Sequence, residues 1–207
     1  MELQIKDPLE SLRTEIQDGV EVDKEILLNS RAIKKQIKNT RIHTLKAKAL
    51  KYLCIEPKDG EQWRIITEKQ FNAYAFILYI LEKYEIEEMH LAIYRINLPT
   101  VESIIDLINE GRIKKSNFII SNFFNQTKKP ERWAMRLRDF CDGEPSCNHA
   151  YTHNHSKVVC LKAGGNYFVF EGSGNMSDNA RIEQYLFENC KETFEFHKSW
   201  MQDIINR

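Results

Sequence analysis

The chain has 207 residues, of which 42% are hydrophobic and 29% charged, and its 30 acidic residues balance 30 basic ones. This length supports one substantial core, or one domain with an N-terminal extension, and the composition is that of a soluble globular protein. Because the formal net charge is zero, overall charge identifies no class of partner.

The sequence lacks the usual features of export and membrane insertion. No apolar run approaches the roughly 20 residues of a membrane-spanning helix, and residues 1–24 are acidic, unlike a signal peptide. The cysteines are odd in number and follow no disulfide spacing, which suits a reducing compartment. They are Cys54, Cys141, Cys147, Cys160 and Cys190. We therefore expect a cytoplasmic protein without stable membrane association.

The first 60 residues differ in charge from the rest. Residues 1–25 hold eight acidic and three basic side chains, whereas residues 30–52 hold eight Lys or Arg and no acid. Apolar residues at four-residue steps between Ile33 and Leu53 predict an amphipathic helix over the basic stretch. Its charged face is either solvated or binds phosphates through Lys34, Lys35 and Lys38. Turn residues at 56–60 separate this helical extension, 1–60, from a domain at 61–207.

Residues 61–207 alternate between helical and strand patterns. Thr67 and Gln70 form a capping box before a helix at 71–84 that is apolar on nearly all sides. A strand at 89–94, a helix at 100–110 ended by Gly111 and a strand at 117–124 predict a right-handed crossover between parallel strands. The later pattern predicts a helix at 130–140, a hairpin of 158–161 and 167–170, a strand at 182–187 and a helix at 190–205. The fold class is therefore α/β.

Two short motifs carry the candidate chemistry. His155-Ser156-Lys157 is followed by Gly172-Ser173-Gly174-Asn175, and Glu183 lies eight residues further on. A lysine and an asparagine can bind the non-bridging oxygens of a phosphate diester, and a histidine can act as nucleophile or proton donor. Either motif alone is weak, but their order and separation together indicate a phosphodiester site.

These residues resemble the signature of the phospholipase D superfamily, H-x-K-x4-D followed by G-S-x-N. The match is at His155, Lys157, Ser173 and Asn175, and the resemblance extends over about two-thirds of the chain, from Gln70 to the end. It implies a mixed sheet flanked by helices and an acidic partner for the catalytic histidine, for which Glu183 is the candidate. Gly172 and Gly174 would mark places where the backbone approaches the substrate. The sequence departs from the signature at Lys162, where the family has an aspartate.

The resemblance also implies a mechanism. In the family one histidine attacks phosphorus to form a phosphohistidine and a second protonates the leaving oxygen, without metal or other cofactor. Only one H-x-K occurs here, so we expect a homodimer that joins His155 from two chains. The expected substrate is DNA or RNA. Two alternatives stay open: a lipid phosphodiesterase or phosphatidyl transferase, and a nucleic-acid-binding protein with a decayed site.

A competing interpretation is a zinc site. The candidate ligands are Cys141, Cys147, His149, His153 and His155. Their spacing matches none of the common structural zinc patterns, and a zinc ion would occupy the proposed nucleophile. We expect His149 and His153 to lie near the mouth of the phosphodiester site, where either could contact a substrate phosphate.

Overall fold

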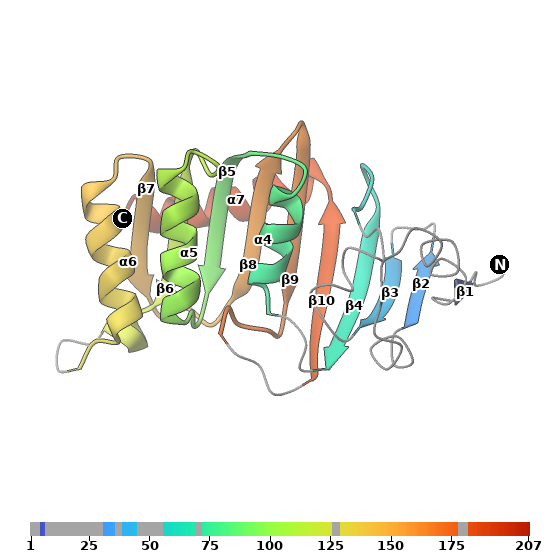
Figure 1. The fold of residues 1–207 in the computed structure, drawn as a ribbon, viewed down its shortest axis with the longest axis horizontal. Coiled ribbons are helices and arrows are strands. Elements are labelled where there is room, and N and C mark those ends of the chain that lie inside the picture. Colours follow the sequence, from blue (N-terminus) through green and yellow to red (C-terminus); the bar gives the residue numbers. More distant parts are fainter. Residues whose placement is uncertain are drawn as a thin grey trace, which may run out of the picture.

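A computed structural model describes residues 56–68, 72–125, 129–177 and 182–207, together with the backbone of three short strands nearer the N-terminus (Figure 1). The strands are β1 (Ile5–Lys6), β2 (Arg31–Lys35), β3 (Asn39–Thr44), β4 (Gln62–Glu68), β5 (Ile86–Ile93), β6 (Ser116–Ser121), β7 (Cys147–Thr152), β8 (Lys157–Ala163), β9 (Asn166–Gly172) and β10 (Ile182–Asn189). They form one mixed sheet in the order β1-β2-β3-β4-β10-β9-β8-β5-β6-β7.

Helices cover both faces of the sheet. Those of the described residues are α4 (Tyr74–Leu81), α5 (Leu98–Asn109), α6 (Arg132–Gly143) and α7 (Lys191–Ile205), with a short 3-10 helix, η2 (Asn122–Asn125). Figure 1 shows α4, α5 and α6 in front of the sheet and α7 behind it. None of these helices is long and apolar enough to cross a membrane.

The core forms two layers because successive strand residues point to opposite faces. In β5, Leu91 and Ile93 belong to the larger cluster with α4, α5 and α6, whereas Ala92 belongs to the cluster that packs on α7. The smaller cluster surrounds Phe194 and Met201, both fully buried. The mixed sheet flanked by helices is thus the α/β architecture that the sequence predicted.

The crossover and the hairpin are confirmed. β5 and β6 are parallel and α5 connects them, with the Asn97 side chain accepting a hydrogen bond from the Thr100 N–H at its start. Gly111, with φ of 73°, follows its end. β8 and β9 form an antiparallel hairpin whose turn contains Gly164 and Gly165 at positive φ, a conformation that favours glycine.

Two sequence-based expectations about the fold are wrong, and one strand was missed. Part of the basic stretch expected to be helical is strand, at β2 and β3, where Thr40, Ile42 and Thr44 recur with the two-residue period of a strand. Thr67 lies in β4 and does not begin a helix; α4 starts at Tyr74, whose N–H bonds to the Asn72 side chain. The strand β7 was not among the elements assigned from the sequence.

The cysteine expectation is also corrected. Cys141, at the end of α6, forms a disulfide with Cys147, at the start of β7. The turn between these elements brings the two side chains together, although their spacing belongs to no common disulfide framework. Cys160 and Cys190 are free thiols, and burial raises the pKa of Cys160 well above its usual value.

The strand β3 pairs with β4 in parallel, so the sheet continues across residue 60. The division into 1–60 and 61–207 stays a prediction.

Candidate functional site

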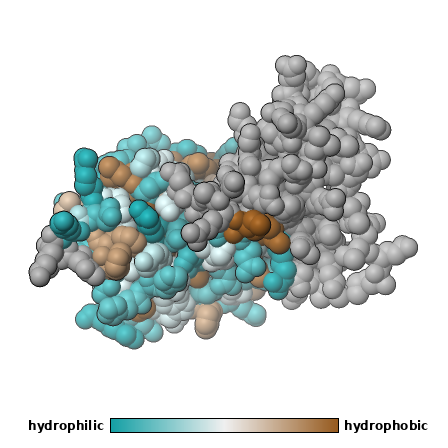
Figure 2. All heavy atoms as spheres, turned by 90° about the horizontal axis from the view of Figure 1, so that it is seen from below, coloured by the Kyte–Doolittle hydropathy of each residue, from teal (hydrophilic) through white to brown (hydrophobic). Residues whose placement is uncertain are grey.

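The topology brings the two motifs to one edge of the sheet. β5 ends beside the start of β8, where Ile93 is opposite Lys157. β9 ends beside the start of β10, where Gly172 is opposite Tyr185. The residues that precede β8 and follow β9 therefore meet at this edge, which is the lower edge in Figure 1. Figure 2 views the molecule from that side and shows a mostly hydrophilic surface with separate hydrophobic patches.

His155 and Lys157 lie side by side at this edge. Lys157 Nζ donates to the carbonyl oxygen of His155 at 2.9 Å and lies 3.5 Å from its Nδ1. The ring of Tyr94 is 4.5 Å from the His155 ring, centroid to centroid, and 5.5 Å from Lys157 Nζ. His155 is exposed and Lys157 is partly buried, so both can meet a ligand from solvent. His155 lies two residues before the start of β8, and Lys157 is the first residue of this strand.

A buried asparagine holds the loop that carries His155. Asn154 Nδ2 donates to the carbonyl oxygens of Ile93 and Ile119, at 3.1 and 3.0 Å, and its Oδ1 accepts from the Ser156 N–H. It thereby ties the residues on both sides of His155 to the ends of β5 and β6. Sequence analysis missed Asn154 and Tyr94, and the only signal for Asn154 was a polar residue directly before the motif.

The second motif lies on the loop after β9. The Asn175 side chain accepts a hydrogen bond from the Arg95 N–H at 3.2 Å. The Ser173 hydroxyl accepts from the Gln184 N–H at 3.0 Å and donates to Glu183. The described hydrogen bonds of Glu183 therefore lead to Ser173 and none to His155, so its role in orienting the imidazole stays a prediction.

The charge of Lys157 is influenced by two opposing effects. Partial burial lowers the pKa of Lys157, and the negative charge of Glu183 acts in the other direction. Glu183 is thus close enough to interact electrostatically with this lysine. The arrangement places an ammonium, an imidazole, an amide and a carboxylate around one part of the sheet edge.

The glycines of the second motif have a packing reason in this structure. A Cβ added to Gly172 would lie 2.1 Å from the Gln184 carbonyl oxygen, and one added to Gly174 would lie 1.8 Å from the Tyr185 hydroxyl. Gly172, the last residue of β9, therefore needs glycine because a Cβ would meet the β10 backbone, whereas at Gly174 the Tyr185 side chain would have to move. Close approach to a substrate, the reason expected from the sequence, stays a prediction.

The remaining candidate residues lie elsewhere. Lys162 is at the far end of β8, where it pairs with Glu87 at 2.8 Å. Lys34 and Lys35 are on β2, and Lys38 is outside the described residues. His153 is exposed on the loop between β7 and β8.

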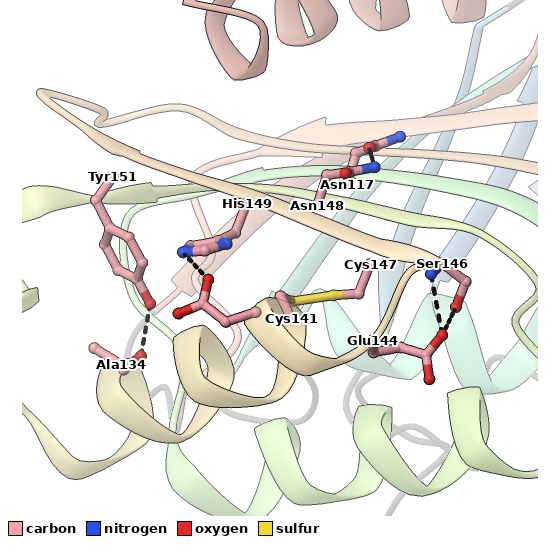
Figure 3. Close-up of a disulfide and its surroundings, with 10 residues drawn as sticks. Asn117, Ala134, Cys141, Glu144, Ser146, Cys147, Asn148, His149 and Tyr151 are labelled. Atoms are coloured by element: carbon pink, nitrogen blue, oxygen red, sulfur yellow. Dashed lines mark hydrogen bonds and ion pairs between the residues drawn. A yellow bond between two sulfur atoms is a disulfide. The ribbon is translucent and has the colours of Figure 1, made fainter.

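The cysteines of the candidate zinc site are not available as metal ligands, because they form a disulfide. Cys141 and Cys147 are bonded to each other (Figure 3). His149 Nε2 lies 3.7 Å from a carboxylate oxygen of Asp142. Burial lowers the pKa of His149. Within the described ranges, no group of three or more His, Cys, Asp or Glu side chains could hold a metal ion.

Solved structures of other proteins share this fold. Nuc, a phospholipase D family member from Salmonella typhimurium, matches with a TM-score of 0.51 at 15% identity, over 70% of this chain and 95% of its own. Polyphosphate kinase from Porphyromonas gingivalis matches with a TM-score of 0.50 at 13% identity, over 70% of this chain and 26% of the kinase. No protein-family model matches the sequence, and no curated protein sequence is similar to it. The structural matches show that the chain has a phospholipase D-like fold, as its motifs predicted.

Proposed function

We propose that this protein is a metal-independent phosphodiesterase that acts on DNA or RNA through a phosphohistidine. The observation that carries the proposal is the pairing of an exposed His155 with Lys157 at the sheet edge where Ser173 and Asn175 also lie. The fold shared with Nuc supports the same chemistry.

In the proposed first step a ring nitrogen of His155 attacks phosphorus. A nitrogen–phosphorus bond forms, the bond to the leaving oxygen breaks, and a second imidazole donates the proton that this oxygen needs. Water then attacks the phosphohistidine, gives a proton to the second imidazole and releases the phosphate monoester. Lys157 uses one donor on the His155 carbonyl and has others for phosphate oxygens. Removing such a charge-stabilising group costs about 3 kcal/mol in barrier.

The second imidazole is proposed to be His155 of another copy of this chain. Each chain has one H-x-K, and a twofold axis at the site edge would place two such motifs face to face.

The first test is turnover of bis(p-nitrophenyl) phosphate in excess EDTA. Wild-type protein should hydrolyse this diester in EDTA, because the positive charge at the site comes from Lys157. His155→Ala should lower the rate of hydrolysis at least about 1,000-fold. Loss of wild-type activity on chelation, restored by zinc or magnesium, would contradict metal independence. Oligonucleotide binding without turnover would identify a binding protein with a decayed site. Turnover of phosphatidylcholine but not of oligonucleotides would favour the lipid enzyme.

The dimer is tested with purified, differently tagged heterodimers of wild-type and His155→Ala chains. Groups that act as one catalytic unit are not additive, so the heterodimer should have far less than half the wild-type rate. Half the rate per dimer, or full activity in a demonstrated monomer, would show that one chain suffices.

A further inference from the structure

A series of contacting rings leads from the proposed nucleophile to an exposed phenylalanine. Tyr94, which contacts His155, packs on Phe124 at 5.1 Å between ring centroids, and Phe124 packs on Phe123 at 5.1 Å. Phe124 is buried, whereas Phe123 has 60% of its surface exposed. Both phenylalanines belong to η2, directly after β6, at the same edge of the sheet as His155. The row therefore ends in an aromatic ring that faces solvent.

Arg95 lies against the same row. It follows Tyr94 after the end of β5, and its guanidinium carbon is 5.8 Å from the centroid of the Phe124 ring. Its N–H bonds to Asn175 of the second motif. The side chain is exposed, and none of the ion pairs found among the described residues involves it. A guanidinium that is held on an aromatic ring, with no carboxylate partner in the described part of the chain, is well suited to bind phosphate.

We infer that Phe123 and Arg95 bind the nucleotide next to the scissile phosphate of a single-stranded nucleic acid. This inference rests on the proposed function for the position of that phosphate. The base stacks on the Phe123 ring, and Arg95 binds the neighbouring phosphate group. Proteins that bind single strands combine these two contacts, and an aromatic face accepts any base. The base must be unstacked to reach the ring, which selects single strands over duplex.

A lipid surface fits these observations less well. Membrane-binding surfaces present a continuous apolar area, whereas Phe123 packs on the buried Phe124 ring, which also contacts the Arg95 guanidinium. Figure 2 shows hydrophobic atoms at this edge in separate patches. A single exposed ring, connected to a guanidinium through the Phe124 ring, matches one base and one phosphate.

The experiment measures binding in a His155→Ala background, so that it does not depend on turnover. The probes are a short fluorescein-labelled oligothymidylate, an abasic oligomer of equal length, and phosphatidylglycerol vesicles. Phe123→Ala should weaken binding of oligothymidylate about 10-fold and change binding of the abasic oligomer less than 2-fold. Phe123→Trp should restore oligothymidylate binding. Arg95→Ala should weaken both oligomers and reduce the salt dependence by about one phosphate contact.

Two exposed residues away from this edge serve as matched controls. Phe196 on α7 has 67% of its surface exposed, and Lys115 is exposed at the opposite end of the sheet, just before β6. Phe196→Ala and Lys115→Ala should leave binding of both oligomers unchanged. Equal losses for Phe123→Ala and Phe196→Ala would overturn the inference, because the effect would then not depend on position.

The two proposals fail in different ways. If wild-type protein turns over methyl p-nitrophenyl phosphate but Phe123→Ala binds oligothymidylate as the parent does, the inference is wrong and the phosphodiesterase stands. If Phe123 and Arg95 are needed for oligothymidylate binding but no diester is turned over, the single-strand binding site stands, whereas its position next to a scissile phosphate and the phosphodiesterase do not. Loss of vesicle binding in Phe123→Ala, with oligothymidylate binding unchanged, would assign the ring to a lipid surface and overturn the inference.

Discussion

A histidine, a lysine, an asparagine and a glutamate occur together in two places among the described residues. Only one of these two places is open to a ligand. At the sheet edge these are His155, Lys157, Asn175 and Glu183. The second set lies under α7, where His90, Asn117, Glu88 and Lys198 bond to one another. His90 has 1% of its surface exposed, whereas His155 is exposed.

The four side chains around the buried His90 satisfy one another's hydrogen-bonding groups. Asn117 Nδ2 donates to His90 Nδ1 at 3.1 Å, which makes Nε2 the protonated nitrogen that faces Glu88 at 3.3 Å. Lys198 Nζ donates to the same carboxylate at 2.6 Å. Burial lowers the pKa of His90, so the neutral ring is favoured. The comparison teaches that exposure and unused donors distinguish a candidate site, whereas residue types alone do not.

The sharpest test of this comparison removes each histidine in turn. His155→Ala should abolish diester turnover and change the free energy of unfolding by less than about 0.5 kcal/mol, as for an exposed side chain. His90→Ala should cost about 2–3 kcal/mol, because it removes a buried ring together with its hydrogen bonds to Glu88 and Asn117. Urea unfolding and turnover of bis(p-nitrophenyl) phosphate by the folded fraction measure both effects. Loss of turnover in folded His90→Ala protein would make the two sets functionally alike.

Asn154→Ala should affect stability and catalysis together, since this residue joins the core to the motif loop. Loss of its buried hydrogen bonds should lower the free energy of unfolding by about 2 kcal/mol. Misplacement of His155 should lower kcat by about 10-fold or more, with a smaller change in KM. Asn154→Asp, which keeps the acceptor for the Ser156 N–H but loses the donors, serves as a second variant. A stable Asn154→Ala protein with normal kcat would show that the loop holds its shape without this side chain.

The buried set also predicts a pH dependence of stability. The pKa of His90 is lowered from 6.5 in the folded protein, so the unfolded chain binds its proton first as pH falls. Stability contributed by the neutral ring is therefore present above pH 6.5 and is lost as pH falls through the folded pKa. His149 and His197 act in the same direction, since burial lowers the pKa of each. Between pH 7 and pH 5, the free energy of unfolding measured in urea should decrease less for His90→Gln than for wild type. Equal decreases would show that His90 does not contribute.

The smallest effect is expected at Lys162, the position that departs from the family signature. Lys162→Asp replaces an exposed ion pair with Glu87 by two like charges at the far end of β8 from His155. The free energy of unfolding should fall by no more than about 1 kcal/mol, and kcat should be unchanged. Lys162→Ala separates loss of the pair from repulsion. A large change in kcat for either variant would connect this position to the site.

The sequence predicted those parts of the fold whose signals are local. Gly111 marks the end of α5, and the glycines at 164 and 165 mark the hairpin turn. The motif residues were found because their spacing matches a known family. The contribution of Tyr94 could not be predicted, because it depends on β5 and β8 being neighbours in space.

Elements that depend on distant pairing were missed. β7, with the sequence Cys-Asn-His-Ala-Tyr-Thr, is polar and becomes a strand by pairing with β6 in parallel. The apolar period of the basic stretch suggested a helix, but β2 and β3 are strands and β3 pairs with β4. The Cys141–Cys147 disulfide follows from the turn between α6 and β7, which the spacing of the cysteines alone does not indicate.

The most direct test of the central claim is to trap the covalent intermediate. Wild-type protein is mixed with bis(p-nitrophenyl) phosphate, quenched in alkali to preserve a phosphohistidine, and digested for mass spectrometry. The account predicts a p-nitrophenyl phosphate adduct on the peptide that contains His155, absent from His155→Ala protein, and none on the peptide that contains His90. Turnover with no adduct on His155, or an adduct on another residue that persists in His155→Ala protein, would contradict it.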